Sequence, residues 1–120
     1  MKERMTDKIA VLVTCGSAKE ARRIGRALVE RKLAACVNLF PVPVRSIYRW
    51  KGRVESAKEF LLLIKTSRKR FGAVAAEVKR LHSYDVPEII ALPVAKGSAN
   101  YLAWISESVR DGGARRRKPR

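Results

Sequence analysis

The sequence predicts an α+β fold in which two helices cover one face of an antiparallel sheet and a third helix follows. Three observations predict this fold. Short apolar runs alternate with helical patterns in the order β-α-β-β-α-β, which is the ferredoxin-like pattern. Lys51-Gly52 is a hairpin turn signal between two arms of strand-forming residues. Right-handed crossovers then order the strands fourth, first, third, second, with both main helices on one face.

The first half of the chain predicts a strand, a capped helix and a second strand. Residues 9–14 form a short apolar run flanked by polar residues, which is typical of a buried strand. Ser17 and Glu20 make a capping-box pattern, and a one-sided apolar stripe then predicts a helix to about Lys32. Residues 33–40 predict the second strand, which a Pro-Val-Pro segment interrupts.

The second half continues the alternation after the hairpin. Ser67 predicts the cap of a second helix that ends near Leu81. Residues 82–88 are a polar connector, residues 89–93 predict a short apolar strand, and residues 100–109 predict the third helix.

The hairpin at residues 46–66 is long for its domain. Its second arm, residues 53–66, would extend roughly 40 Å at ~3.3 Å per residue. A compact chain of this length is only about 35 Å across. Part of the hairpin must therefore bend, bulge or project, and a projecting edge favours pairing with another copy. The strands are also apolar on both sides, so the sheet face without helices favours an oligomer as well.

The length of 120 residues predicts one domain at residues 9–110, between a flexible N-terminus at 1–8 and a disordered basic tail at 111–120. No apolar run approaches the roughly 18 residues that cross a bilayer, and the first residues lack the apolar core of a signal peptide. We expect a cytoplasmic protein with no membrane partner and with two free thiols, Cys15 and Cys36.

The net charge of +16 makes nucleic acid a candidate partner, because clustered cations gain affinity for phosphate. Many of these cations lie in the tail, and the others alternate with Glu along expected solvent faces. The aromatic residues form no stacking platform. We therefore expect no nucleic-acid partner beyond nonspecific attraction to the tail.

The predicted topology brings Cys15, at the end of the first strand, towards His82, the only histidine. A thiolate and an imidazole suit zinc or copper, and the soft sulfur favours Cu(I). A structural interpretation stands beside this one: Cys15 as a small buried hydrophobe, and His82 as a helix-end residue bonded to a carbonyl. Two ligands are fewer than the four of a structural zinc site.

Catalysis has less support. The sequence holds no Ser-His-Asp, Cys-His-Asn or paired-carboxylate spacing and no glycine-rich phosphate loop, so we expect no enzyme. Cys36 lies inside a predicted strand and is expected in the core.

Six segments in order resemble the CutA family of divalent-cation tolerance proteins and cover nearly everything from residue 9 to 109. They are Val11-Leu-Val-Thr-Cys15, Leu33-Ala-Ala-Cys36-Val-Asn38, Ser46-Ile-Tyr-Arg-Trp50-Lys-Gly52, Leu61-Leu-Leu-Ile-Lys-Thr66, His82-Ser-Tyr84-Asp-Val-Pro87-Glu88-Ile and Tyr101-Leu-Ala-Trp104-Ile.

The resemblance implies a ferredoxin-like subunit in a homotrimer whose long hairpins pair between subunits, similar to PII signalling proteins. It implies copper or another divalent cation as the bound metal, with Cys15 and His82 at positions where some bacterial members have copper ligands. Those members carry a His-His pair, whereas this chain has Leu81-His82. It also implies an intersubunit pocket, whose ligand it leaves open, formed by Trp50, Lys65, Tyr84 and Glu88.

Overall fold

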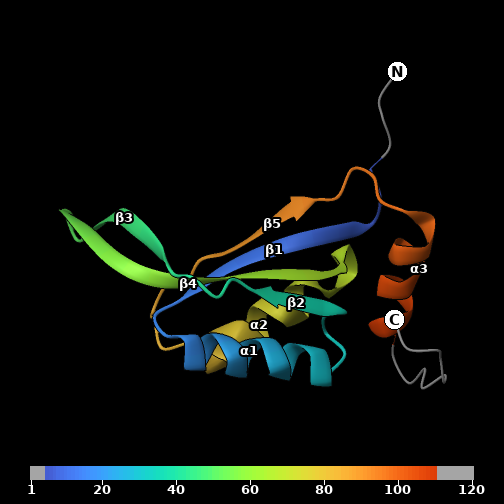
Figure 1. Cartoon of the computed structure of the whole chain (residues 1–120), viewed down its shortest axis with the longest axis horizontal. Helices are drawn as coiled ribbons and strands as arrows, with labels where there is room; N and C mark the ends of the chain where they lie inside the picture. Colours follow the sequence, from blue (N-terminus) through green and yellow to red (C-terminus); the bar gives the residue numbers. More distant parts are fainter. Residues whose placement is uncertain (1–4, 111–120) are drawn as a thin grey trace.

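The computed structural model describes residues 5–110, which form five strands, three α-helices and a short 3-10 helix (Figure 1). Their bounds are β1 (Lys8–Cys15), α1 (Ala18–Glu30), β2 (Cys36–Leu39), β3 (Val44–Trp50), β4 (Arg53–Ser67), the 3-10 helix (Arg68–Arg70), α2 (Phe71–Leu81), β5 (Ile89–Pro93) and α3 (Ala99–Ser108). None of the helices within residues 5–110 is long and apolar enough to cross a membrane.

The main sheet has the order β2-β4-β1-β5, and every neighbouring pair is antiparallel. This is the strand order that the crossover rule predicts. Helices α1 and α2 lie together on one face, and α3 stands at the end of the sheet opposite the hairpin (Figure 1).

The hairpin of β3 and β4 projects beyond the sheet (Figure 1). Its turn places Lys51 at φ 52° and Gly52 at φ 78°. Two consecutive residues with positive φ make the type I′ turn that matches the twist of paired strands. The predicted turn is therefore confirmed, and β4 continues from it for 15 residues.

The core lies between the sheet and the two main helices. It contains branched side chains that alternate along β1 and β4 and follow one stripe of each helix, which is the pattern that predicted these elements. The fully buried members include Val11, Val13, Ile24, Leu28, Leu62, Ile64, Val74 and Val78.

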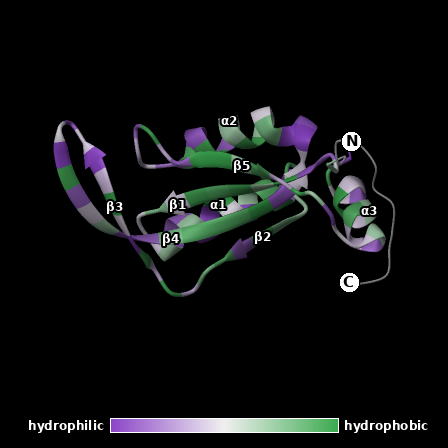
Figure 2. Cartoon of the chain, turned by 90° about the horizontal axis from the view of Figure 1, so that it is seen from above, coloured by the Kyte–Doolittle hydropathy of each residue, from purple (hydrophilic) through white to green (hydrophobic). Residues whose placement is uncertain are grey.

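The opposite face of the sheet is apolar and uncovered in the single chain, as predicted. Ile90 and Leu92 of β5 are each 49% exposed, and Leu12 and Leu63 beside them are half-buried. Figure 2 views this face, where β1, β4 and β5 are largely hydrophobic. Cys36 pairs with Lys65 of β4 on this face and is half-buried, so its expected place in the core is wrong. Successive side chains of a strand point to opposite faces of the sheet, and Cys36 lies on the face that the helices do not cover.

Three element ends differ from the predictions. The second strand begins at Cys36 rather than at residue 33. Ser67 precedes the 3-10 helix and makes no side-chain capping bond, because that helix separates it from α2. β1 begins at Lys8, and the Thr6 N–H donates to the Val94 carbonyl, so residues 6–8 are paired to the domain. The predicted basic tail at 111–120 lies outside the described residues.

Alanine substitutions at Gly52, in the turn, and at Gly72, in α2, should have opposite effects on stability. Gly52→Ala forces a side chain into the left-handed region and should lower the free energy of unfolding by about 1 kcal/mol. Gly72→Ala in α2 is the control, because its Cβ would meet nothing within 4 Å and should raise stability by about 0.5 kcal/mol. Urea unfolding measures both; a neutral Gly52→Ala would contradict the strained turn.

Candidate functional site

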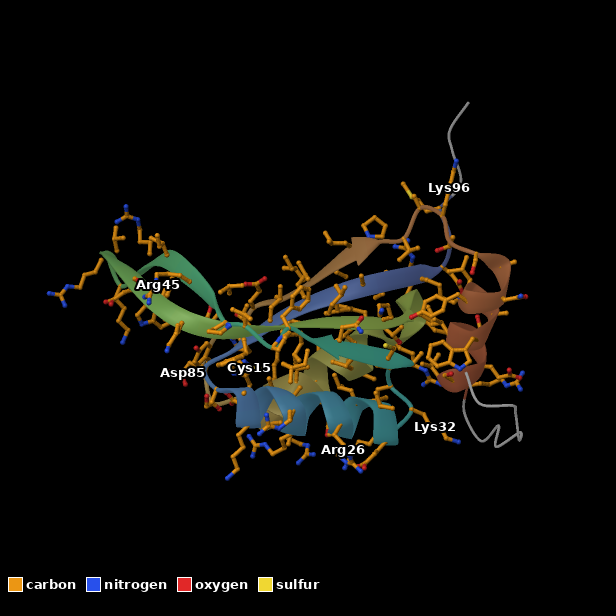
Figure 3. The ribbon with its side chains drawn as sticks, in the orientation of Figure 1. Cys15, Arg26, Lys32, Arg45, Asp85 and Lys96 are labelled. Atoms are coloured by element: carbon orange, nitrogen blue, oxygen red, sulfur yellow. The ribbon has the colours of Figure 1, made fainter. Side chains whose placement is uncertain are left out.

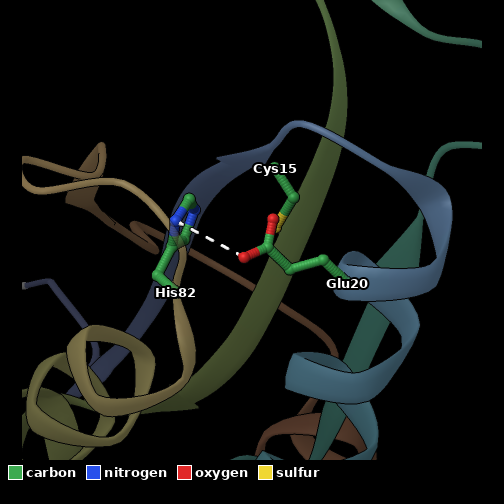
Figure 4. A group of neighbouring side chains, drawn as sticks. All are labelled: Cys15, Glu20 and His82. Carbon is green, nitrogen blue, oxygen red and sulfur yellow. Dashed lines mark ion pairs between the residues drawn. The ribbon is translucent and has the colours of Figure 1, made fainter.

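Three potential metal ligands converge where β1, α1 and the connector after α2 meet (Figure 4). One ligand atom each from Cys15, Glu20 and His82 lies within 4.8 Å of the others. Cys15 ends β1, Glu20 lies in the first turn of α1, and His82 follows the last residue of α2. The prediction that the topology brings Cys15 towards His82 is therefore confirmed. The group is enclosed, since the side chains of His82 and Glu20 are 0% and 9% exposed.

Hydrogen bonds occupy both ring nitrogens of His82. The Tyr84 N–H donates to Nδ1 at 3.1 Å, so the ring proton lies on Nε2, which donates to the Thr14 carbonyl at 2.8 Å. The Nδ1 atom lies 3.9 Å from the Glu20 carboxylate. His82 is thus bonded to a carbonyl, as the structural interpretation expects, and a metal at Nδ1 would replace the bond from Tyr84.

Glu20 is a potential ligand that the sequence did not predict. Ser17 caps α1 by accepting from the Glu20 N–H at 3.1 Å, so half of the predicted capping box is present. The Glu20 carboxylate accepts from the Ser83 N–H at 2.7 Å. The capping pattern gave Glu20 a local explanation. A carboxylate in the first turn of α1, so soon after Cys15, also lies close to the residues that pack at the end of β1, and this proximity was a second signal in the sequence.

Cys15 is a protonated, fully buried thiol. Burial raises its pKa to about 12, and the negative charges of Glu20 and Glu59 act in the same direction. A thiolate is the form that binds metal. A metal ion must therefore displace the thiol proton, and its positive charge would offset the repulsion between the thiolate and its two acidic neighbours.

The donor set fits a borderline or soft metal ion. Sulfur, nitrogen and carboxylate oxygen would fill three positions of a tetrahedral site and leave one for another ligand. Hard cations such as Ca²⁺ prefer six to eight oxygen ligands, which this group does not offer.

A cleft of about 700 Å³ is lined by residues of the connector together with residues of β1, β3 and β4. Trp50, Tyr84 and Glu88, three of the four predicted pocket residues, line it together. Lys65 does not line it; its Nζ lies 5.8 Å from the centre of the Tyr101 ring, near α3. The single chain therefore brings three of the predicted pocket residues together and leaves the fourth apart.

Glu59 of β4 is one of the carboxylates that line this cleft. The Tyr84 hydroxyl donates to it at 2.8 Å, and Glu59 is only 7% exposed. Burial, followed by this bond, raises the pKa of Tyr84. Burial and the charge of Glu59 likewise raise the pKa of Glu88. The sequence analysis missed Glu59, because a single Glu in a long strand reads as a solvent-facing charge.

Comparisons with known proteins agree with the fold and with the six segments. The model of the CutA1 divalent ion tolerance protein family matches residues 9–108. The "Divalent-cation tolerance protein CutA" of Thermus thermophilus is 51% identical over 82% of this chain and 94% of its own length. The chain belongs to the CutA family.

A solved CutA structure extends this likeness. The structure of the "Periplasmic divalent cation tolerance protein CutA" of Archaeoglobus fulgidus has a TM-score of 0.83 and 43% identity, and it covers 86% of this chain and 99% of its own. In this CutA chain, Leu81 stands beside His82 and packs against the core. Glu20 supplies the third donor of the group instead.

The raised pKa of Cys15 predicts a loss of stability at high pH. Above its ordinary value of 9.0, the unfolded thiol releases a proton that the folded state retains up to about 12. Stability should therefore fall as pH rises from 9 to 11, by up to about 1.4 kcal/mol per pH unit. Urea unfolding of Cys36→Ser, compared with Cys15→Ser/Cys36→Ser, isolates this loss, and equal pH slopes in the two variants would contradict it.

Proposed function

We propose that this CutA protein binds copper or another divalent cation through Cys15, Glu20 and His82 and acts in metal tolerance without catalysing a reaction. The observation that carries the proposal is the convergence of three different donor atoms within 4.8 Å in an enclosed group. The name of the Thermus relative, a divalent-cation tolerance protein, supports the same role. Copper is our choice of metal because thiolate and imidazole ligands favour it.

The nonenzymatic part of the proposal rests on the state of the thiol. A cysteine nucleophile is activated by a lowered pKa, whereas burial and acidic neighbours raise that of Cys15. The imidazole beside it already donates from Nε2 to a carbonyl.

A second candidate function is an interaction scaffold in which metal is incidental. The hydrogen bonds on both nitrogens of His82 favour it, because the group is complete without an ion. A homotrimer related in architecture to PII sensors would be compatible with either function.

We also propose that three copies assemble into a ferredoxin-like homotrimer, with membrane and nucleic acid not among the partners. The half-exposed Ile90 and Leu92 and the projecting hairpin support self-association. A cytoplasmic location remains our prediction, supported by the free thiols Cys15 and Cys36. The Archaeoglobus relative is described as periplasmic.

Calorimetric titration with copper, under reducing and nonreducing conditions, tests the metal proposal. We expect submicromolar binding that becomes at least tenfold weaker in Cys15→Ser, Glu20→Gln and His82→Gln, because each removes a donor. Cys36→Ser is the matched control and should bind as the parent does. Weak binding that all variants share would favour the scaffold.

Sedimentation tests the assembly. The parent should have three times the 13.5 kDa mass of the chain. Leu92→Lys should lower the mass at micromolar concentration by placing a charge on the uncovered face, whereas Val29→Lys on α1 should leave it unchanged. A parent that sediments as a single chain would overturn the trimer.

A further inference from the structure

We propose that the outer face of helices α1 and α2 docks an acidic segment of another protein, whose carboxylates are held by arginines of this face. The inference goes beyond metal tolerance and stands without it. In Figure 3, Arg26 lies on the side of α1 that points away from the sheet. Exposed cations gather on this side of the molecule, which we call the cationic face: Lys19, Arg22, Arg23, Arg26, Arg31 and Arg80.

The cationic face remains accessible in the proposed trimer. Self-association would bury the uncovered sheet face and the projecting hairpin, whereas α1 and α2 lie on the other side of the sheet (Figure 1). The side chains of Arg26, Arg31 and Arg80 are 80%, 60% and 58% exposed. A partner would therefore reach this face on each copy without competing with the contacts between subunits.

The acids of the two helices leave this positive charge on the outside. α1 and α2 contain three acids, Glu20, Glu30 and Glu77. The side chains of Glu20 and Glu77 are only 9% and 7% exposed, because Glu20 belongs to the metal group and Glu77 lies between Arg31 and Arg80. Of these three acids, Glu30 alone is well exposed, at 62%. The sequence suggests that cations alternate with acids along solvent faces, but two of the three acids face inward.

The carboxylates of the chain itself indicate which anion these arginines bind. Arg80 donates two hydrogen bonds to Glu77, from Nε to Oε1 at 3.1 Å and from Nη2 to Oε2 at 2.8 Å. Arg26 donates from Nε to Glu30 at 2.9 Å. A planar guanidinium matches a carboxylate through two parallel hydrogen bonds, and Arg80 has this geometry. The cationic face is therefore suited to carboxylates that a partner supplies.

The spacing of the cations on α1 fits an extended segment. Residues three or four apart on a helix have Cβ atoms about 5–6 Å apart, and Lys19, Arg22 and Arg26 follow this spacing. Alternate side chains of an extended chain lie on one side, about 6.6 Å apart at ~3.3 Å per residue. A segment with an acid at every second position would therefore place successive carboxylates beside successive cations of α1.

Single-stranded nucleic acid fits the cationic face less well. Proteins that bind it without sequence preference stack its bases on aromatic side chains. Within α1 and α2 the one aromatic residue is Phe71, which is half-buried at the start of α2 and packs against the core. An acidic protein segment needs no stacking platform, because its carboxylates supply the contacts.

NMR titration of the full-length protein tests the docking with a peptide of alternating Glu and Ser, about eight residues long. The backbone amide signals of Arg22 and Arg26 should shift saturably. Those of Arg68 and Lys69, exposed cations of the 3-10 helix, should not. A peptide with Gln in place of each Glu should leave all of these signals unshifted. Because the affinity is read from signals of α1, binding at the basic tail does not enter it.

Paired variants separate recognition by arginine from attraction by charge. Arg22→Gln/Arg26→Gln should bind the peptide at least fivefold more weakly, whereas Arg68→Gln/Lys69→Gln, which removes the same charge, should stay within twofold of the parent. Arg22→Lys/Arg26→Lys keeps the charge but loses the guanidinium groups, and its binding should be at least threefold weaker. Glu30→Gln removes the acid that competes for Arg26, so its binding should be at least twofold tighter.

Several results would overturn the docking proposal. They are unshifted α1 signals, equal binding of the Gln peptide, and undiminished binding in Arg22→Gln/Arg26→Gln. Equal binding in Arg22→Lys/Arg26→Lys would reduce the interaction to nonspecific attraction and would overturn it as well. An oligothymidylate that shifts the same signals at lower concentration than the peptide would assign the face to nucleic acid instead. These variants keep every donor of the metal group, so their copper affinity and sedimentation mass should equal those of the parent, and failure here is distinguishable from failure of the metal proposal.

Discussion

The pairing of β4 with three other strands is the constraint on which the rest of the structure depends. Its second half lies between β1 and β2 in the sheet, and its first half pairs with β3 in the hairpin. Phe60 is the last β4 residue paired with β1, opposite Cys15, and Glu59 is the next residue outward, opposite Val44. One strand therefore fixes the cysteine at the edge of the core and the carboxylate at the base of the hairpin. A slip of one residue would exchange the faces of Glu59 and Phe60 and remove both groups.

Tyr84 joins the metal group to the cleft. Its N–H donates to His82 Nδ1 and its hydroxyl donates to Glu59. Gly16 makes room for it, because a Cβ at that position would lie 3.2 Å from the Tyr84 hydroxyl oxygen. An ion bound at Nδ1 would break the hydrogen bond from the Tyr84 N–H. Metal binding to Cys15, Glu20 and His82 would therefore loosen Tyr84 and affect its hydrogen bond to Glu59. By linkage, a ligand that held Tyr84 in place would oppose the ion by the same free energy.

The sequence predicted the features that depend on periodicity and turn chemistry. The hairpin turn, the order of the elements, the uncovered apolar face and the approach of Cys15 to His82 all follow from local patterns and crossover handedness. It did not predict that Glu20 lies beside Cys15 and His82 or that Glu59 lines the cleft, because a carboxylate at a helix start or in a strand has an ordinary local explanation. The half-buried place of Cys36 was mispredicted for another reason: it depends on strand parity, which no short segment encodes. Lys65 lies beside α3 in the single chain, and its place in a pocket between subunits stays a prediction.

The metal group differs from a structural metal site in being satisfied without an ion. Structural zinc sites supply folding energy, because the unfolded chain has no preformed site and the free energy of metal binding is gained only on folding. Here the thiol is protonated, both imidazole nitrogens are hydrogen-bonded, and Glu20 accepts from the Ser83 N–H. An arriving ion must displace the thiol proton and the Tyr84 bond, so part of its binding free energy is spent on exchange. The hydrogen bonds that complete the group without an ion would keep the fold intact when an ion leaves.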